Sequence, residues 1–258
     1  DLAMRNQKRI VFPESLNPKI IEAALWLFEK SIVSEITFFC DEKEFKDKAL
    51  QLGFSLNKRL FKKICFLDLN EQGKKVLDCL IDRSKKELSS EKRKIFEKKA
   101  STALYQAFYL LKSDQVDALV AGIDYSTADV LRAGLSLLEK ASSAQTISGS
   151  FFLSPSQKSI NKELLLFSDC AVCIDPSSDD LVEIASSTVK TWQSVLGESI
   201  KPRLAFLSFS TKGSATHPKA EKIRLAAEKF HKLHPEIISD GELQFDAVVS
   251  KRIAEKKA

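Results

Sequence analysis

The sequence predicts an α/β protein of two domains, each with a mostly parallel sheet flanked by helices. Short, almost wholly apolar runs alternate with stretches of helical periodicity, which is the pattern of parallel sheets covered on both faces. Two of the apolar runs lead into loops rich in glycine and hydroxyl side chains. With 258 residues, 44% of them hydrophobic, the chain can bury one large core or two modest ones.

The first domain is expected over residues 1–141. Its first helix begins with Asn17 as the N-cap and Pro18 as the first residue, and apolar residues from Ile20 to Phe28 recur at helical spacing. Strands are expected over residues 9–13, 35–40, 64–67 and 116–121, the last buried on both faces. Further helices are expected over residues 41–52, over 75–112 with a break at 88–90, and over 128–138.

The second domain is expected over residues 142–258, because the small polar run at 141–144 is the best candidate boundary in a chain without a Pro-, Gly- or Ser-rich linker. Asp179 and Asp180 lie in the first turn of a predicted helix, where the helix dipole favours acids. The predicted elements are strands over residues 147–153, within 164–174 and over 204–208, helices over 177–196 and 218–232, and a strand or helix over 243–249.

Charge and cysteine content exclude several classes of function. The net charge of +5 is small beside 40 basic and 35 acidic residues, and the lysines lack interleaved aromatics, so no nucleic-acid surface is expected. No signal peptide or membrane-spanning run is visible. Cys40 and Cys65 lie in apolar runs, and Cys170 and Cys173 form a C-x-x-C without the partners that a zinc site needs. We expect a reducing cytoplasm and no metal site.

The first candidate site is the loop that follows the predicted strand over residues 116–121. Gly122 permits a tight exit from this strand. Ser126 and Thr127 place hydroxyls near a helix N-terminus, and Arg132 lies in the second turn of that helix. Ligands of open α/β sheets bind at the carboxyl ends of strands, so this loop is a candidate anion site. The alternative is a helix cap with a surface arginine.

The second candidate site follows the apolar run Leu204–Ser208. Its residues are small, hydroxylated or cationic, and comprise Ser210, Thr211, Lys212, Gly213 and Ser214. A strand that leads into such a loop and then a helix is how α/β proteins build anion sites, because loop N–H groups and the helix N-terminus point at the ligand. The alternative is a Ser/Thr turn with an N-cap. The Walker A and Gly-x-Gly-x-x-Gly patterns are absent from the sequence, which argues against a nucleoside triphosphatase or a dinucleotide enzyme.

The three histidines, His217, His231 and His234, lie close together in the sequence. His231 and His234 are expected in a solvated C-terminal helical turn, where the dipole favours a cationic imidazole. A metal site there is the minor alternative. No Ser/His/Asp set is recognisable from the order of residues.

Six motifs occur in one order along nearly the whole chain. They are Lys8–Glu14 (KRIVFPE), Val116–Gly122 (VDALVAG), Ser126–Arg132 (STADVLR), Phe167–Ala171 (FSDCA), Leu207–Ala215 (LSFSTKGSA) and Asp240–Asp246 (DGELQFD). Each alone is modest, but together, with this spacing, they resemble the phosphate acetyl/butyryl transferase family. The last motif is more typical of the acetyl than of the butyryl branch.

The resemblance implies two α/β domains with a substrate cleft between them, an isocitrate/isopropylmalate dehydrogenase-like architecture, and a homodimer joined through the second domain. It implies an acyltransferase of acetate metabolism that moves an acetyl group reversibly between coenzyme A and inorganic phosphate, giving acetyl phosphate, without a cofactor. The alternatives are an enzyme for a longer acyl chain such as butyryl, and a non-catalytic member that keeps the cleft. The architecture also resembles metal-dependent decarboxylating dehydrogenases, whose clustered aspartates are not seen in this sequence.

Carried over residue by residue, Arg132 matches a family arginine that handles the phosphate or the acyl phosphate. Arg83 matches a second arginine in an Arg-x-x-Lys-Gly pattern, although Glu87 stands where the glycine belongs. Cys170 matches a cysteine near the cleft, and its alternative is a buried strand cysteine. The loop Ser210–Ser214 matches the family's loop at the cleft.

The family pattern continues past Ala258 into a segment with a Ser-Arg…Asp motif. In the resemblance this motif supplies the serine and arginine at the acyl centre and the aspartate that acts as base for the thiol. The catalytic residues are therefore expected beyond Ala258. The alternatives are that the sequence is a fragment of a longer protein, that a C-terminal tail is missing from this sequence, or that the protein is a natural truncation without activity.

Overall fold

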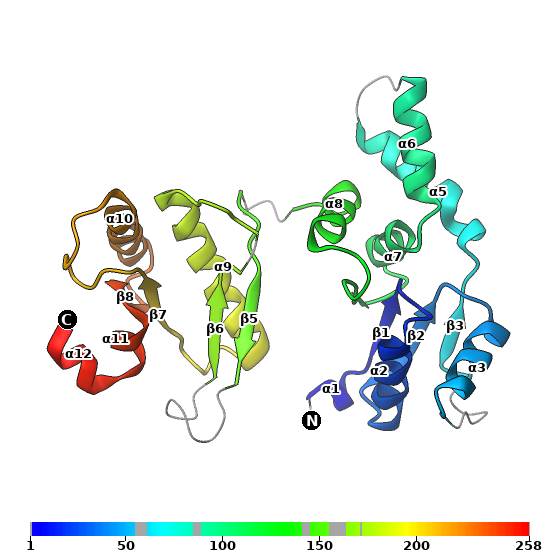
Figure 1. Ribbon diagram of the computed structural model, residues 1–258, viewed down its shortest axis with the longest axis horizontal. Helices are drawn as coiled ribbons and strands as arrows, with labels where there is room; N and C mark the ends of the chain where they lie inside the picture. The colour runs from blue at the N-terminus through cyan, green and yellow to red at the C-terminus, as the bar shows by residue number, and fades with distance from the viewer. Residues whose placement is uncertain are drawn as a thin grey trace. The chain divides into compact units, whose positions relative to one another are not determined.

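The computed structural model describes residues 2–54, 61–84, 89–140, 145–154, 164–170 and 172–257. The chain divides into two compact units, Asp1–Glu139 and Lys140–Ala258, each with its own sheets and its own buried clusters. The predicted boundary run at 141–144 lies outside the described residues. The α/β class is confirmed, because strands and helices alternate along the chain (Figure 1).

The first unit is built on a four-stranded, wholly parallel sheet in the order β3-β2-β1-β4. Its strands are β1 (Lys8–Phe12), β2 (Val33–Phe38), β3 (Ile64–Phe66) and β4 (Ala118–Leu119). In register, Ile10 of β1 pairs with Ile36 on one side and with Ala118 on the other. Because β1 and β4 are parallel neighbours, the segments that leave their carboxyl ends start side by side.

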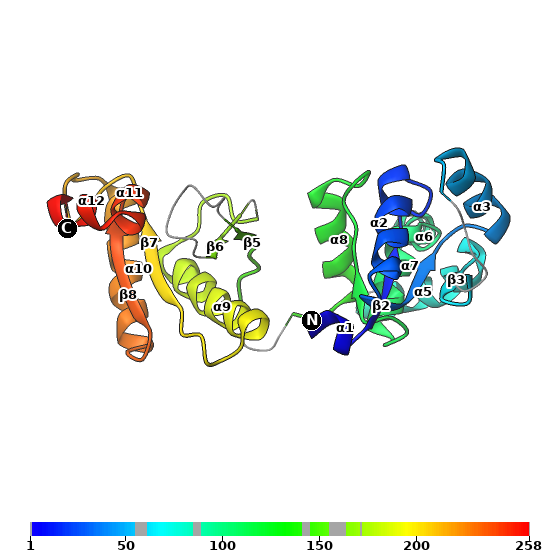
Figure 2. The same ribbon diagram turned by 90° about the horizontal axis from the view of Figure 1, so that it is seen from below.

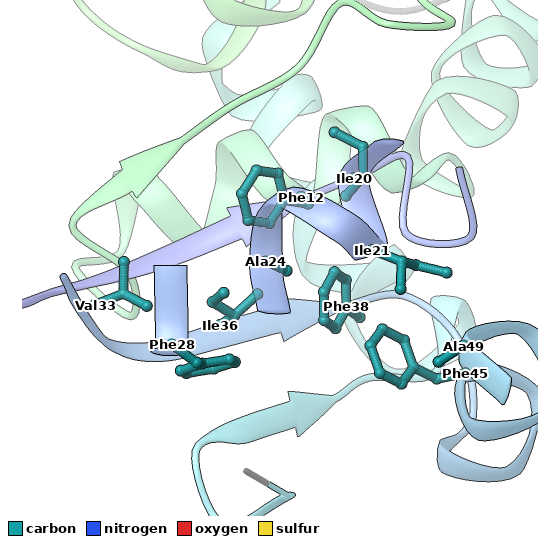
Figure 3. Close-up of a cluster of buried hydrophobic side chains, with 10 residues drawn as sticks. All are labelled: Phe12, Ile20, Ile21, Ala24, Phe28, Val33, Ile36, Phe38, Phe45 and Ala49. Atoms are coloured by element: carbon teal, nitrogen blue, oxygen red, sulfur yellow. The ribbon is translucent and has the colours of Figure 1, made fainter. Parts of the chain in front are cut away.

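Helices cover both faces of this sheet. Phe12 packs into a buried cluster with α2 (Pro18–Glu29) and α3 (Glu42–Gln51), which Figure 3 shows in close-up. The preceding residue, Val11, packs on the opposite face with α7 (Ala103–Lys112). The two faces separate in this way because successive side chains of a strand point to opposite sides.

The predicted start of the first helix is confirmed. The Asn17 side chain accepts the Lys19 N–H at 3.0 Å, and Pro18 is the first residue of α2. Ile21 and Ala24, on the apolar stripe, are 0% and 1% exposed. Local cap chemistry and helical periodicity therefore both act as the sequence indicates.

The region 75–112 forms parts of three helices, where a single break was expected. The helices are α5 (Leu69–Ser84), α6 (Ser90–Ala100) and α7. The additional break falls at Ser101 and Thr102, whose hydroxyls donate to carbonyls of the preceding turn at 3.0 and 2.7 Å. Such bonds compete with continuation of the helix. None of the helices in the described ranges is long and apolar enough to cross a membrane.

Helix α8 (Thr127–Leu137) completes the first unit and packs with α5 and α7 in a second buried cluster. A Cβ added to Gly134 would lie 3.2 Å from the Phe108 ring. The glycine therefore lets α8 approach α7 closely.

The second unit contains two small sheets, one antiparallel and one parallel. The antiparallel pair is β5 (Ser150–Leu153) with β6 (Leu165–Ser168), and the parallel pair is β7 (Arg203–Leu207) with β8 (Ile238–Leu243). The connection over residues 154–164 is too short for the helical crossover that parallel pairing of β5 and β6 would need. The expectation of mostly parallel sheets therefore holds fully only in the first unit.

Two long helices cover the strands of the second unit. α9 (Ser178–Leu196) and α10 (Pro218–Leu233) pack on one another, and α10 lies alongside β7 and β8 (Figures 1 and 2). The Phe206 and Phe230 rings meet edge to face at 5.7 Å in the shared cluster. The chain continues from β8 into α11 (Phe245–Val249) and α12 (Lys251–Lys257).

The strand predicted over residues 116–121 is shorter and more exposed than expected. Only Ala118 and Leu119 form β4, and Val120 is 48% exposed. Among the described strands, β4 pairs with β1 alone and lies at the edge of its sheet. The prediction of burial on both faces is therefore wrong for Val120.

All five cysteines are described, each is half-buried, and none is in a disulfide. Burial raises the pKa of the Cys40 thiol to about 12, so this side chain stays protonated at neutral pH. Burial also raises the pKa of the Cys173 thiol. Over the part of the chain that the structure describes, no cluster of three or more His, Cys, Asp or Glu side chains could hold a metal ion.

Candidate functional site

Two of the predicted side chains on the first exit loop meet at one carboxylate. Ser126 is the N-cap of α8: its hydroxyl accepts the Asp129 N–H at 3.2 Å and donates to the Asp129 carboxylate at 2.7 Å. The other oxygen of Asp129 lies 2.7 Å from the Arg132 guanidinium, whose side chain is 57% exposed. The Ser126 hydroxyl, followed by Arg132, lowers the pKa of Asp129. Thr127 is the exposed first residue of the helix.

A buried carboxylate lies beneath this loop. Glu14, two residues after β1, is 7% exposed. Its Oε1 accepts the N–H groups of Asp124 at 2.7 Å and Tyr125 at 3.0 Å, and both oxygens lie 3.1 Å from the Gly122 nitrogen. Gly122 has a φ of +118°, which glycine adopts without strain. The N–H groups that this loop could offer to an anion are therefore directed to a side chain of the protein itself.

The second exit loop, Ser210–Ser214, also forms hydrogen bonds to a buried carboxylate. Glu242, in β8, is 3% exposed. Its Oε1 accepts the Ser210 hydroxyl at 2.8 Å and the Gly213 N–H at 3.0 Å. Its backbone carbonyl accepts the Lys212 N–H at 3.2 Å. One residue of the neighbouring strand thus holds the loop at three points.

The hydroxyl groups of the second loop bond to its own backbone. Ser214 Oγ accepts the Thr211 N–H at 3.0 Å, and Ser210 Oγ accepts the Ala215 N–H at 3.0 Å. Ser210 and Thr211 are 0% and 3% exposed, whereas Lys212, Gly213 and Ser214 are exposed. The buried pair therefore shapes the loop, and the three exposed residues form its outer surface.

An open groove of about 570 Å³ lies beside this loop, between α10 and β8. Lys212 and Asp240 both line this groove, and the Lys212 ammonium contacts the Asp240 carboxylate. The backbone φ of Lys212 is +47°. Arg224 of α10 is paired with Glu221 and Glu228. An anion in the groove would therefore compete with carboxylates for both cations.

The histidines have structural partners that the sequence analysis did not anticipate. His217 is the N-cap of α10, and its Nδ1 accepts the Lys219 N–H at 3.1 Å. The His234 ring lies 4.7 Å from the Phe230 ring, and its Nε2 is 2.9 Å from Ser186 Oγ. The expectation of a solvated turn is therefore wrong for His234, because α9 packs against this end of α10, and confirmed for the exposed His231.

Arg83 contacts the end of α8 that is remote from Ser126. Its Nη2 donates to the Leu138 carbonyl at 3.0 Å, and its Nη1 pairs with Glu139 at 3.3 Å. Since an 11-residue helix is about 16 Å long, Arg83 does not join the hydroxyls at the other end. It borders a separate pocket of about 340 Å³ between α5 and α7. Glu87, in the same expected motif, lies outside the described residues.

Cys170 lies two residues after the end of β6. Its N–H donates to the Gly149 carbonyl at 2.9 Å, and its thiol lies 3.5 Å from the Phe167 carbonyl. The preceding residue, Asp169, accepts three backbone N–H groups, among them those of Gly149 at 2.6 Å and Cys173 at 2.7 Å. The structure therefore places this half-buried cysteine next to a carboxylate that bonds the backbone on both sides of it in the sequence.

Comparison with known proteins decides the family. A family model described as "Phosphate acetyl/butaryl transferase" matches residues 1–258. The chain belongs to this family. The resemblance seen in six motifs is thereby confirmed, and the family's members include curated and structurally characterised proteins.

The chain is 32% identical to the phosphate acetyltransferase of Clostridium acetobutylicum, over 100% of its own length and 75% of that protein. It is 34% identical to the phosphate acetyltransferase of Bacillus subtilis, over 97% of the chain and 73% of the relative. A phosphotransacetylase from Streptococcus pyogenes superposes with a TM-score of 0.77 at 29% identity, covering 98% of this chain and 73% of that one. A branched-chain phosphotransacylase from Enterococcus faecalis, at 15% identity and a TM-score of 0.58 over 96% of this chain and 73% of that one, shows the fold alone.

Sequence reasoning missed three carboxylates that organise these loops. Glu14, Asp169 and Glu242 each lie in one of the six motifs, and each accepts hydrogen bonds from backbone N–H groups. For Glu14 and Asp169, an acidic residue within two positions of the end of an apolar run was the signal that could have found them, whereas β8 (ISDGEL) offers no such signal for Glu242. Acidic residues are rarely buried unless they are paired in this way.

Proposed function

We propose that the protein catalyses the reversible transfer of an acetyl group between coenzyme A and inorganic phosphate. The observation that carries this proposal is the family match over residues 1–258. It is supported by relatives named phosphate acetyltransferase that align with at least 97% of the chain.

The chemistry is acyl transfer. A phosphate oxygen attacks the thioester carbonyl of acetyl-CoA, the C–S bond breaks, and the coenzyme A thiolate leaves. In reverse, the thiolate attacks acetyl phosphate, the C–O bond to phosphate breaks, and phosphate leaves. Negative charge grows on the carbonyl oxygen and on phosphate, where cations and N–H donors stabilise it. No electron transfer is involved, so we propose that the substrates suffice without a cofactor.

In the first unit, we assign the phosphoryl group to Arg132, Ser126 and Thr127. The Arg132 guanidinium is exposed, and its ion pair with Asp129 is a surface contact that contributes little to stability. Phosphate can replace this partner and gain charge-assisted hydrogen bonds. The two hydroxyls lie at the N-terminus of α8, where the helix dipole favours an anion.

In the second unit, Lys212 and Ser214 are the proposed substrate contacts of the loop. Both are exposed, whereas Ser210 and Thr211 are buried and Gly213 gives its N–H to Glu242. We assign these other three residues the task of shaping the loop.

The two remaining candidate residues, Arg83 and Cys170, are assigned to the substrate site without a contact to the group that Arg132 holds. Arg83 borders its own pocket, so we propose that it contacts a part of the substrate other than the group held by Arg132. Cys170 is assigned to the wall of the substrate site without a chemical role, because acyl transfer directly between two substrates needs no nucleophilic cysteine.

The base that deprotonates the thiol is none of the three buried or half-buried motif carboxylates. Glu14 and Asp169 have both oxygens directed at donors within the fold, and Oε1 of the buried Glu242 is bonded to the Ser210 hydroxyl and the Gly213 N–H. A general base needs a lone pair within reach of the proton that it removes. We propose that the base lies elsewhere in the protein.

We further propose a cytoplasmic homodimer joined through the second unit. Phe151 and Leu153 of β5 are 59% and 49% exposed, and contiguous apolar side chains of this kind mark interaction surfaces. The absence of disulfides among five cysteines favours a reducing compartment. Sedimentation equilibrium of wild-type protein and of Phe151→Asp tests the dimer, which the substitution is expected to weaken.

The experiment that tests the activity is thiol release from acetyl-CoA by the full-length protein, with and without inorganic phosphate. We expect release that depends on phosphate and is faster with acetyl-CoA than with butyryl-CoA. A preference for butyryl-CoA would favour the longer-chain alternative. A folded protein without phosphate-dependent release would refute the proposal.

A further inference from the structure

We propose that Glu14 and Glu242 are positioning residues whose carboxylates hold the two strand-exit loops in the form that binds substrate. This inference rests on the proposed function, because the loops carry the substrate contacts named there. The two residues belong to the motifs Lys8–Glu14 and Asp240–Asp246, for which the reaction itself has no evident use.

In the first unit, the parallel pairing of β1 and β4 brings Glu14 under the segment that leaves β4. Three N–H groups of the segment over residues 122–125 converge on its carboxylate, which is almost removed from solvent. Asn17 adds a second attachment, because its Nδ2 donates to the Asp124 carboxylate at 3.0 Å. Ser126 follows directly and begins α8, so the direction of α8 and of Arg132 depends on this attachment.

In the second unit, the parallel pairing of β7 and β8 brings Glu242 under the loop that leaves β7. The carboxylate holds Ser210 and Gly213, and the carbonyl of the same residue holds Lys212. Lys212 lies between these two attachments with a φ of +47°, a conformation that a lysine adopts only where its surroundings impose it. The exposed position of its side chain therefore depends on Glu242.

The chemistry of the two sites favours an ionised carboxylate, and most directly at Glu14, where both oxygens face one N–H. An ionised carboxylate has two oxygens that only accept, whereas a glutamine of the same shape carries two N–H donors in place of one oxygen. At Glu14 that amide group would face the Gly122 N–H, since both carboxylate oxygens lie 3.1 Å from its nitrogen. At Glu14, replacement by glutamine therefore sets a buried amide donor against the Gly122 N–H at nearly constant packing volume. At Glu242, it removes the negative charge of the group that accepts the Ser210 hydroxyl and the Gly213 N–H.

The two sites have the same design although they lie in different units. In each, the acid lies within, or two residues after, the strand beside the one that the loop leaves, and its carboxylate accepts at least one backbone N–H group of that loop. A carboxylate that served only the stability of the fold could bond anywhere. Both are bonded to the loops that carry the proposed phosphate contacts, which indicates a role in the geometry of the site.

The test compares Glu14→Gln and Glu242→Gln in the full-length protein with the matched exposed controls Glu22→Gln and Glu198→Gln. Steady-state kinetics give kcat and the KM for phosphate and for acetyl-CoA, and amide hydrogen exchange reports on the loops independently of activity. We expect kcat/KM for phosphate to fall by about 10- to 100-fold, as a displacement of about 1 Å at a reacting group does. Exchange is expected to accelerate over residues 122–125 in one variant and 210–215 in the other. The controls are expected to match wild type.

The milder variants Glu14→Asp and Glu242→Asp keep the charge and withdraw the oxygens by one methylene group. We expect them to show a smaller fall in kcat/KM for phosphate than the glutamine variants. If a glutamine variant does not fold, the aspartate variant at the same position tests the positioning role in its place. Wild-type kinetics in folded variants, or faster exchange throughout a unit without a KM effect on phosphate, would overturn the inference alone. A wild-type protein without phosphate-dependent thiol release would instead refute the proposed function.

Discussion

Replacement of Arg132 by alanine separates substrate binding from folding more cleanly than any other change at the candidate site. The side chain is 57% exposed, and its ion pair with Asp129 is a surface contact within one helix. Such pairs contribute little to stability, and alanine is a good helix former. We therefore expect the melting temperature to change by less than about 2 °C.

The expected kinetic effect of Arg132→Ala is much larger. A hydrogen bond between charged groups contributes about 1.5–3 kcal/mol, and the loss of one such bond to phosphate corresponds to about 10- to 150-fold in kcat/KM. We expect KM for phosphate to rise and kcat to fall, with KM for acetyl-CoA changed less. The assay is initial-rate thiol release at varied phosphate.

The matched control is Arg93→Ala. Arg93 lies on α6, is 60% exposed, and pairs with Glu97 at 3.3 Å, so its removal loses the same kind of surface contact at a residue assigned to neither strand-exit loop. It is expected to behave as wild type in both measurements. Unchanged phosphate kinetics in Arg132→Ala, or equal effects in the two variants, would refute the assignment of Arg132 to phosphate.

Three further predictions test the core, an ion pair and the thiol. Phe38 is fully buried, so Phe38→Ala is expected to lower the free energy of unfolding in urea by about 3–5 kcal/mol; Leu50→Ala, at an exposed position of α3, is expected to cost below about 1 kcal/mol, and equal costs would contradict the core assignment. The Arg9 guanidinium holds the pKa of Asp117 well below its usual range, so the stability from this pair is present above about pH 4 and is lost as the pH falls toward the folded-state value. The melting temperature should therefore fall more steeply below pH 4 in wild type than in Asp117→Asn, and identical profiles would show that the pair contributes nothing. Cys170→Ala is expected to leave turnover largely intact, because no step uses a nucleophilic cysteine; a loss of several orders of magnitude in kcat by a folded variant would prove this wrong.

The parts of the fold that could be predicted are those with a local cause. Asn17 and Pro18 start α2 through contacts within three residues, and Ser177 starts α9 through a capping box with Asp180. The apolar stripe of α2 is buried because helical spacing alone puts its members on one side. The sequence states these causes directly, since every partner lies within one helical turn.

The parts that could not be predicted depend on distant partners. β4 is short and Val120 is exposed because β4 lies at the edge of its sheet, and strand order is not readable from the strand itself. His234 is half-buried because Ser186, 48 residues away, meets it across two packed helices. Neither the edge position of β4 nor the contact between Ser186 and His234 leaves a signal in the sequence around these residues.

The features of the candidate site also separate into those with a local cause, which could be predicted, and those that depend on distant partners, which could not. Both loops could be located, because an apolar strand that leads into glycines and hydroxyls is a local pattern. Their internal organisation could not, because Glu14 meets Gly122 over 108 residues and Glu242 meets Gly213 over 29. The sequence therefore predicts where the two candidate anion loops lie, whereas the contacts of Glu14 and Glu242 with these loops depend on the pairing of the strands.

The most direct test of the central claim is the stoichiometry of the reaction. Full-length protein is incubated with acetyl-CoA and inorganic phosphate, released thiol is measured by colorimetry, and acetyl phosphate is measured by phosphorus NMR in the same sample. A phosphate acetyltransferase must form one acetyl phosphate for each thiol released, and must run backwards when acetyl phosphate and coenzyme A are supplied. Thiol release without acetyl phosphate would show hydrolysis in place of transfer and would contradict the account.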